Sequence, residues 1–336
     1  MTFKTTLFKN NMFQILTVAK KEYTDALKNR VFLTFLLFLV GLTIISIFVG
    51  SLDFQSKVSV YQKAYQQLIQ SGQSVSNLTK PEFYPLQLLR GSIEYLEIIG
   101  AVLAIALGYL SIAKEKGNNT LQLILTRPIS RVSFFLGKLM GNALLLLLVS
   151  AIVFISIYFI VTLIGGVQLT ASETVKILFS FLFSWIYLFV FFSLSATLAL
   201  LFRSLTNALI LAFVIWILFV LIVPQIGDTM DTDNQVPGGF FNAIHVDNPQ
   251  SKIILLQFSG YETARNSIEE ASITKHFERL TFALLGIKDT YNGKSLSFIF
   301  RDKFNEIVWL TAYLIFFGAS SLFIFTKKQT LWRQDV

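Results

Sequence analysis

The stretch Val31-Phe-Leu-Thr-Phe-Leu-Leu-Phe-Leu-Val-Gly-Leu-Thr-Ile-Ile-Ser-Ile-Phe-Val-Gly-Ser-Leu52 contains no charged residue and consists mainly of Leu, Ile, Val and Phe. About 20 predominantly apolar residues suffice for a helix to cross the hydrocarbon core of a bilayer. A secretory signal peptide has a shorter apolar core and a small-residue cleavage site. The stretch therefore predicts a membrane-spanning helix that is retained in the protein.

Further apolar stretches of similar length follow along the chain and bring the predicted number of spans to six. They are residues 93–113, 139–164, 177–202, 205–227 and 307–326. Only Arg203 and Ser204 separate the fourth span from the fifth, which is enough for the turn of a helical hairpin at the membrane surface. The predicted fold class is an all-α polytopic membrane protein with six transmembrane helices.

The composition of the 336-residue chain agrees with this class, because 54% of the residues are hydrophobic and only 14% are charged. Ordinary soluble domains carry about 25% charged residues. The chain has no Cys, which excludes disulfides, thiolate metal sites and cysteine nucleophiles. The net charge of +8 comes from Lys and Arg beside the apolar stretches, where anionic lipid explains it. We therefore predict a lipid partner and no nucleic-acid partner.

The distribution of Lys and Arg predicts the orientation, since short cytoplasmic segments carry an excess of both. Residues 1–30 hold six Lys or Arg against two acids, and residues 114–138 hold five against one. Residues 228–306 carry eight Lys or Arg against eleven acids. Both termini and the 114–138 loop are therefore predicted to be cytoplasmic, and the 53–92 and 228–306 segments extracytoplasmic.

Residues 12–29 have the pattern of an amphipathic helix rather than of a span. At 100° per residue one face is apolar and the opposite face is polar. The apolar face contains Met12, Ile15, Leu16, Ala19, Tyr23, Ala26 and Leu27. Such a helix lies in the membrane interface, or, alternatively, packs on a soluble partner.

Catalytic and metal-binding motifs are weak or absent in the sequence. The nearest approach to a phosphate-binding loop is Gly137-Lys138, but Val132 and Leu139 replace residues that the motif requires. His276 follows Glu269 and Glu270 in a polar segment, whereas an embedded hydrolase would need such groups within its spans. We predict no catalytic site, no metal site and no ATP site in this chain.

Asp228, Asp231 and Asp233 lack the spacing and the closing Glu of a calcium loop, so we interpret this run as a solvated loop.

Glu94 and Glu97 lie three residues apart at the predicted outer end of the second span. Residues at this spacing share one face of a helix, and carboxylates near membrane depth are often functional. The pair therefore could line an outer vestibule. Alternatively, both carboxylates lie at headgroup depth and are hydrated.

The 114–138 loop contains a predicted short helix of its own. Thr120 or a neighbouring Asn can cap it, and Leu121, Ile124 and Leu125 fall on one apolar face. Pro128 prevents its continuation, and Ser130 can cap the next helix, which runs into the third span. A short apolar face of this kind fits a groove on a soluble partner or lies on lipid.

These segments resemble the type-2 ABC transporter permeases. The resemblance is carried by Ala19-Lys-Lys-Glu-Tyr-Thr-Asp-Ala-Leu-Lys-Asn-Arg30 and by Ala113-Lys-Glu-Lys-Gly-Asn-Asn-Thr-Leu-Gln-Leu-Ile-Leu-Thr-Arg-Pro-Ile-Ser-Arg131 with Leu136-Gly-Lys138. Leu200-Leu-Phe-Arg-Ser204 and Pro224-Gln225 extend it over most of residues 12–227. The sequence is most similar to the branch encoded with nitrous-oxide reductase maturation, although a chain without Cys and with four Met gives no support for metal passage.

The resemblance implies a membrane subunit of a bacterial inner membrane whose energy comes from a separate ABC ATPase subunit. ATP and Mg²⁺ are expected on that subunit, and no cofactor is expected on this chain. A second permease chain, identical or related, completes the assembly, and an extracytoplasmic partner is also considered. The implied ATPase-coupling residues are Glu115, Gly117, Thr120, Leu121, Ile124, Leu125, Pro128 and Arg131. The implied functional residues of the interfacial helix are Lys20, Glu22, Tyr23, Asp25 and Arg30.

The predicted organisation has five parts. They are the cytoplasmic N-terminus with its interfacial helix (1–30), the first five spans with the outer loop 53–92 and the coupling loop 114–138 (31–227), an enlarged extracytoplasmic segment (228–306), the sixth span (307–326) and a cytoplasmic tail (327–336). The predicted function is to couple ATP hydrolysis to export or to a transmembrane conformational change. Two alternatives are motion transmitted to an envelope partner without substrate passage and, less favoured, a membrane-embedded hydrolase.

Overall fold

The structure is a computed structural model, which describes residues 2–71, 84–117, 129–163, 169–231, 240–246 and 248–327. All regular secondary structure in these ranges is helical. The elements are α1 (Thr2–Leu27), α2 (Arg30–Gln70), η1 (Pro85–Leu89), α3 (Arg90–Tyr95), η2 (Leu96–Gly100), α4 (Ala101–Gly117), α6 (Arg131–Leu163), α7 (Ala171–Leu201), α8 (Leu205–Trp216), η3 (Ile217–Ile222), α9 (Val223–Met230), α10 (Phe240–Ala243), α11 (Asn248–Gln257), α12 (Ser259–Glu270), α13 (Ile273–Leu284), η5 (Asp289–Tyr291), α14 (Leu296–Asp302) and α15 (Phe304–Lys327).

Six helices or helical series in these ranges are long and apolar enough to cross a membrane, which confirms the predicted number of spans. They are Arg30–Gln70, Pro85–Lys116, Arg131–Thr162, Ala171–Leu201, Leu205–Met230 and Phe304–Lys327. Two of them contain a π-helical turn, η2 in the second span and η3 in the fifth. The fourth and fifth spans form the predicted hairpin, in which the Ser204 side chain accepts a hydrogen bond from the Asn207 backbone N–H.

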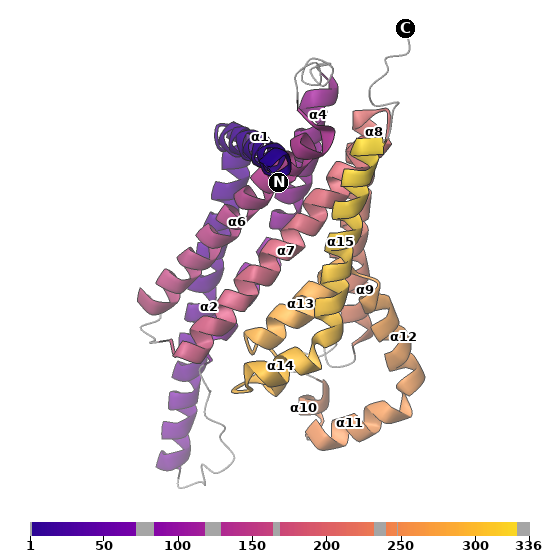
Figure 1. Cartoon of the computed structure of the whole chain (residues 1–336). Coiled ribbons are helices and arrows are strands. Elements are labelled where there is room, and N and C mark those ends of the chain that lie inside the picture. Colours follow the sequence, from indigo (N-terminus) through magenta and orange to yellow (C-terminus); the bar gives the residue numbers. More distant parts are fainter. Residues whose placement is uncertain are drawn as a thin grey trace.

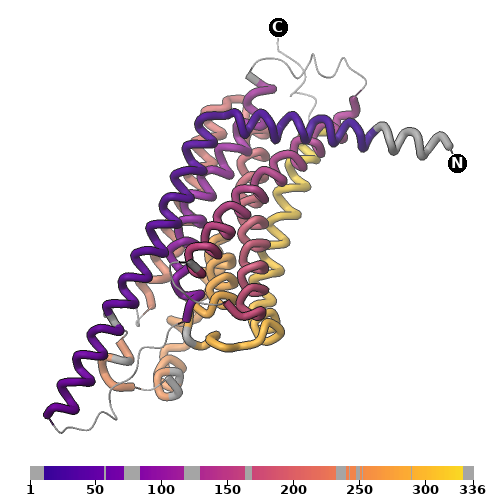
Figure 2. The backbone as a smooth tube through the Cα atoms, turned by 90° about the vertical axis from the view of Figure 1, so that its left-hand side faces the viewer, coloured from indigo at the N-terminus to yellow at the C-terminus, as the bar shows by residue number. Residues whose placement is uncertain are grey.

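The spans run side by side, and α1 lies across one end of the bundle (Figures 1 and 2). The last residues of α4, the first residues of α6, the turn between α7 and α8 and the last residues of α15 lie at this same end, here called the α1 end. Helices α10 to α14 gather toward the opposite end, here called the far end. Which of these two ends faces the cytoplasm stays a prediction from the distribution of Lys and Arg.

The α7 helix forms the centre of the bundle and contacts α4, α6, α13 and α15. Its Tyr187, Phe191 and Phe192 side chains are almost completely buried. Gly108 allows α4 to approach it closely, because a Cβ atom at that position would lie 2.3 Å from the Phe192 carbonyl oxygen. The Ser195 hydroxyl donates to the Ile105 carbonyl oxygen at 2.8 Å, so α4 and α7 are joined by close packing and by a hydrogen bond.

The α2 helix is much longer than predicted, because its 41 residues continue from the first span to Gln70. Residues 53–70 belong to the 53–92 segment, which the sequence predicts to be an outer loop. They contain no Gly or Pro, and Phe54, Tyr61 and Leu68 continue the half-buried stripe of the helix. At 1.5 Å per residue the whole helix is about 60 Å long. Figure 2 shows it extending past the far ends of the other spans.

The 228–306 segment is packed more deeply than its charged sequence indicates. Helix α12 ends at Glu270, and Ser272 caps α13 by accepting hydrogen bonds from the Thr274 and Lys275 backbone N–H groups. Ile273, Phe277 and Leu280 are at most 1% exposed. Their spacing forms one apolar stripe, which packs α13 onto α7 and α15. One face of α13 is therefore buried in the bundle, and the extracytoplasmic location of residues 228–306 stays a prediction.

His276 of α13 is buried in the interior of the bundle. Its ring is 2% exposed and stacks on Trp309 at 5.8 Å between centroids, and Nε2 lies 2.9 Å from the Glu270 carbonyl oxygen. The carboxylates of Glu269 and Glu270 pair with Arg279 instead of with His276. The geometry therefore gives no support to an embedded hydrolase built on these residues.

Candidate functional site

A buried group of charges joins three helices at the α1 end. Lys138 of α6 is 1% exposed, and its ammonium group lies 2.7 Å from Glu22 Oε1 of α1 and 3.0 Å from Glu115 Oε1 of α4. It also donates to the Ser111 carbonyl oxygen at 2.9 Å. A lysine ammonium has three N–H donors, and these three acceptors match them. Lys138, Glu22 and Glu115 are called the Lys138 cluster below.

The positions of Glu115 and Lys138 in their helices place the cluster beside the 118–130 segment. Glu115 lies in the last turn of α4, and Lys138 lies two turns into α6, so both flank the 118–130 segment. Buried charges are costly unless they are paired and hydrogen-bonded. The three residues therefore constrain α1, α4 and α6 to one relative position, in which each charge has its partner.

Two glycines of α6 let α1 approach closely enough for Glu22 to reach Lys138. A Cβ atom at Gly137 would lie 2.6 Å from the Val18 Cβ, and one at Gly141 would lie 2.6 Å from the Ala19 carbonyl oxygen. Small residues at a four-residue spacing are a common means of close helix contact in membranes. The packing of α1 on α6 therefore depends on positions that carry no side chain.

The apolar face predicted for residues 12–29 coincides only in part with the face of α1 that packs on α6. Ala19 and Ala26 are buried as expected, but they share the contact face with Val18 and Glu22. Met12, Phe13 and Leu16 remain 56%, 69% and 45% exposed. The α1 helix therefore has two apolar surfaces, of which one packs on α6 and the other is available to lipid or to a partner.

The remaining residues predicted for this end of the chain are distributed around the cluster. Lys20 and Arg30 are exposed, Tyr23 and Asp25 are half-buried, and Lys21 lies 3.9 Å from Glu115. Gly117 ends α4, and exposed Arg131 begins α6. Ser130 caps α6 as predicted, because its Oγ accepts from the Ser133 backbone N–H at 3.0 Å. Thr120, Leu121, Ile124, Leu125 and Pro128 lie outside the described residues.

Lys116 joins α4 to the end of α7 in a contact that the sequence did not suggest. Its ammonium group donates to the Ala199 carbonyl oxygen at 3.1 Å and to the Phe202 carbonyl oxygen. Cationic side chains at a helix C-terminus satisfy its last carbonyl groups. The end of α4 is thereby held by the Lys138 cluster on one side and by the end of α7 on the other.

Glu94 and Glu97 do not share one environment. Glu94 is half-exposed and pairs with Arg90 at 2.9 Å, whereas Glu97 is 6% exposed and its Oε1 has no hydrogen-bond partner among the described residues. Glu97 lies in the π-helical turn η2, where the wider turn changes the α-helical spacing of faces. The Glu94 side chain is thus partly exposed and the Glu97 side chain is buried, and both the outer vestibule and hydration at headgroup depth stay predictions.

A polar cavity of about 670 Å³ lies at the far end and is lined mostly by charged residues that pair with one another. Lys275 donates to Asp228 at 2.8 Å and pairs with Glu278 at 2.9 Å. Burial alone would lower the pKa of Lys275, but attraction by Glu278 and the hydrogen bond to Asp228 raise it above its ordinary value. Asp231 pairs with Arg265, and Asp233 lies outside the described residues. In the described ranges no group of three or more His, Asp and Glu side chains could hold a metal ion.

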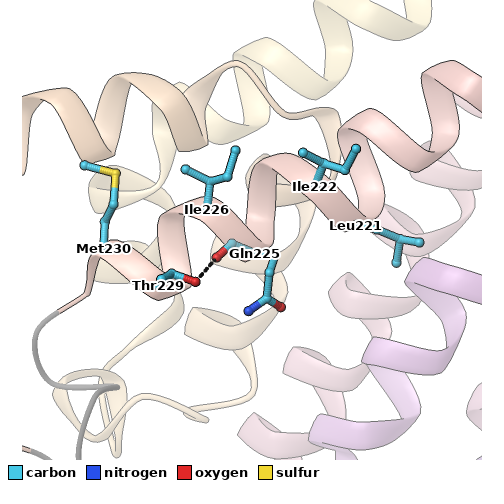
Figure 3. Close-up of a pocket in the computed structure, with 6 residues that line it drawn as sticks. All are labelled: Leu221, Ile222, Gln225, Ile226, Thr229 and Met230. Carbon is cyan, nitrogen blue, oxygen red and sulfur yellow. Dashed lines mark hydrogen bonds between the residues drawn. The ribbon is translucent and has the colours of Figure 1, made fainter.

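The fifth span carries an open apolar groove of about 570 Å³. Figure 3 shows that Leu221, Ile222, Gln225, Ile226, Thr229 and Met230 line it from one helical series. The Thr229 hydroxyl donates to the Gln225 carbonyl oxygen at 2.7 Å, so it does not face a ligand as a free donor. This surface belongs to the exterior of the bundle and is accessible to lipid or to another chain.

Comparison with known families gives one match over most of the chain. A family model described as ABC-2 family transporter protein matches residues 16–330. No curated protein matches the chain.

Proposed function

The chain belongs to the ABC-2 transporter family, and we propose that it couples ATP hydrolysis in a separate ATPase subunit to a change in the packing of its six spans. It is a multi-pass membrane subunit, and such subunits have no ATPase domain of their own. The observation that carries the proposed mechanism is the Lys138 cluster. It connects α1 with both ends of the 118–130 segment, in which the apolar face of Leu121, Ile124 and Leu125 is predicted.

In this proposal the ATPase subunit receives the 118–130 segment and moves it during the ATP cycle. A displacement of this segment moves the end of α4 and the start of α6 together, because Glu115 and Lys138 are bonded. The contacts of α4 with α7 at Gly108 and at Lys116 then pass the movement to the centre of the bundle. The exposed surface of α1 with Met12, Phe13 and Leu16 offers a second contact for lipid or for the ATPase.

A second permease chain, identical or related, is part of the proposal. In the most apolar part of the fifth span only 17% of the residues are buried, compared with 61% in the second and fourth spans. The groove in Figure 3 lies on this span and gives a second chain a surface on which to pack. ATP and Mg²⁺ are proposed to bind the ATPase subunit alone. The α1 end is proposed to face the cytoplasm of a bacterial inner membrane.

Transmission of motion to an envelope partner is a second candidate function, and the length of α2 favours it. Residues 53–70 continue the first span as a rigid helix beyond the membrane-length segment. A helix of this kind would carry a displacement at the α1 end to a protein outside the membrane. Export of a substrate remains the first candidate, and its chemical identity is not assigned. The relation to the nitrous-oxide reductase branch stays a prediction from the sequence.

The test of the proposed function is co-purification with the ATPase subunit in mild detergent, followed by measurement of ATP hydrolysis. The wild-type chain should retain the ATPase subunit. Leu121→Asp places a charge on the predicted docking face and should release that subunit, while the amount of membrane-inserted chain stays normal. Gln235→Asp, in the 228–306 segment that is predicted to be extracytoplasmic, is the matched control. Full association and coupled activity in Leu121→Asp would show that this helix lies on lipid instead.

A further inference from the structure

The second span carries a buried carboxyl group that is separate from the Lys138 cluster. Glu97 lies in the π-helical turn η2 and is 6% exposed, and its Oε1 atom is buried without a hydrogen-bond partner among the described residues. A π-helical turn inside an α-helix is frequently found at functional sites. A buried charge is costly unless it is paired and hydrogen-bonded, and an isolated buried carboxylate is neutralised instead.

The turn that carries Glu97 is fixed by buried contacts with α7 and α13. The Tyr187 hydroxyl of α7 donates to the Glu97 carbonyl oxygen at 2.9 Å and lies 3.1 Å from Thr274 Oγ1 of α13. Tyr187 and Thr274 are at most 1% exposed. In the same turn, a Cβ atom at Gly100 would lie 2.9 Å from Leu188 Cδ2 of α7. A larger exposure of the Glu97 side chain therefore requires a change in these contacts.

Most of the charges that act on the Glu97 carboxyl group are negative. Three acids repel a negative charge there, and they are Glu278 of α13, Glu94 of α3 and Asp228 of α9. Lys275 of α13 attracts such a charge. Its ammonium group, however, already pairs with Asp228 at 2.8 Å and with Glu278 at 2.9 Å. A lysine that two other carboxylates share does not compensate a third one.

The polar cavity of about 670 Å³ provides a route for a proton to and from this place. Asp228, Lys275 and Glu278 line the cavity and are also the electrostatic neighbours of Glu97 on α9 and α13. A polar cavity of this size has room for water. A proton that leaves Glu97 therefore has an aqueous space beside it.

We propose that Glu97 is a proton-binding carboxyl group. In the packing that the structure shows, Glu97 carries a proton and is neutral, which removes both the cost of a buried charge and the repulsion by the neighbouring acids. When the contacts of η2 with α7 and α13 change and the group meets water, its O–H bond breaks, the electron pair stays on the oxygen and the proton passes to water in the cavity. The packing of these helices is thereby linked to the uptake and release of a proton. The proposal requires neither an ATPase partner nor a particular transported substrate.

The first test is infrared spectroscopy of the purified full chain in mild detergent at neutral pH. A protonated carboxyl group has a C=O stretching band that a carboxylate lacks, and an ordinary Glu, with a pKa of about 4.3, is ionised at this pH. The band should be present in the wild type and lost in Glu97→Gln, whose side chain resembles a neutral carboxyl group in shape. Glu270→Gln is the control and should keep the band, because the Glu270 side chain is 57% exposed. A wild-type spectrum without the band, or the same band in Glu97→Gln, would overturn the proposal.

The second test is the pH dependence of unfolding. A carboxyl group that is protonated in the folded chain and ionised in the unfolded chain makes the folded state less stable as the pH rises. This loss begins at the usual Glu pKa of about 4.3 and ends where the folded chain also releases the proton. Within this interval each pH unit should lower the folding equilibrium constant of the wild type about tenfold relative to that of Glu97→Gln.

The same control applies to this measurement. Glu270→Gln should follow the wild-type pH profile. Glu97→Met also lacks the carboxyl group and replaces Glu97→Gln in both tests if that variant does not fold. Parallel pH profiles of the wild type and of the Glu97 variant would contradict the assignment, because a merely structural role of Glu97 changes stability equally at every pH.

Discussion

Replacement of Lys138 by Met is the most informative perturbation of the site at the α1 end. It leaves the Glu22 and Glu115 carboxylates, which are 7% and 6% exposed, without their shared cation. Removal of one partner of a buried ion pair costs roughly 3–5 kcal/mol, because the remaining charge stays buried and uncompensated. Here two like charges remain together, so we expect the upper part of this range. Lys21, at 3.9 Å from Glu115, is exposed and offsets little of it.

The size of the effect should follow the number of charges left unpaired. Glu22→Gln leaves Lys138 with Glu115 and the Ser111 carbonyl oxygen, so its cost should be about 1–3 kcal/mol. The triple variant Lys138→Met, Glu22→Gln, Glu115→Gln removes every charge of the cluster and should recover a large part of the stability lost in Lys138→Met. Chemical unfolding of the purified chain followed by circular dichroism measures these differences. Lys63→Met serves as the exposed control.

The relative stabilities of these variants test whether uncompensated charge explains the loss. If Lys138→Met unfolds at the same denaturant concentration as Lys63→Met, the cluster does not hold α1, α4 and α6 together. If the triple variant is no more stable than Lys138→Met, the loss comes from packing of the long side chain and not from uncompensated charge.

Three further results are expected. Cysteines introduced at Asn118 and Gln329 should be protected from impermeant thiol reagents in intact cells and one at Asn234 should react; reaction of Asn118→Cys from outside would reverse the orientation. The purified chain alone should hydrolyse no ATP above a mock preparation, and hydrolysis by a homogeneous sample would contradict its role as a membrane subunit without an ATPase domain. Gly141→Val should detach α1 from α6 and lower the free energy of unfolding by several kcal/mol, because even a Cβ atom at this position meets the α1 backbone. Gly260→Ala is the control in the same unfolding assay and should have little effect, because no atom lies within 4 Å of its Cβ position.

The spans could be predicted because hydropathy is local. Each is long enough to be recognised on its own, and Ser130 and Ser204 mark helix starts by their chemistry alone. The Lys138 cluster could not be predicted in this way. Lys138 and Glu22 are 116 residues apart in the sequence, and their contact depends on the close approach of α1 at two glycines.

The burial of α13 and the length of α2 could not be predicted either, because the local sequence of each segment indicates a different structure. The charges of Lys275, Glu278 and Arg279 give α13 a polar sequence. Lys275 pairs with Glu278, and Arg279 pairs with Glu269 of α12, which permits the apolar stripe beside them to be buried. The end of the first span was placed where apolar residues stop, but a helix ends where its backbone is interrupted. Residues 53–70 contain no Gly or Pro, and α2 continues through them to Gln70.

The most direct test of the account measures whether ATP changes the packing of the spans through the Lys138 cluster. Because the chain has no Cys, a single spin label at Ile226→Cys reports on the groove of the fifth span in the reconstituted complex with its ATPase subunit. Addition of ATP and Mg²⁺ should change the mobility of the label in the wild-type background. In a Glu115→Gln background ATP hydrolysis should persist while the change in mobility is reduced. An equal change in both backgrounds would contradict coupling through the cluster.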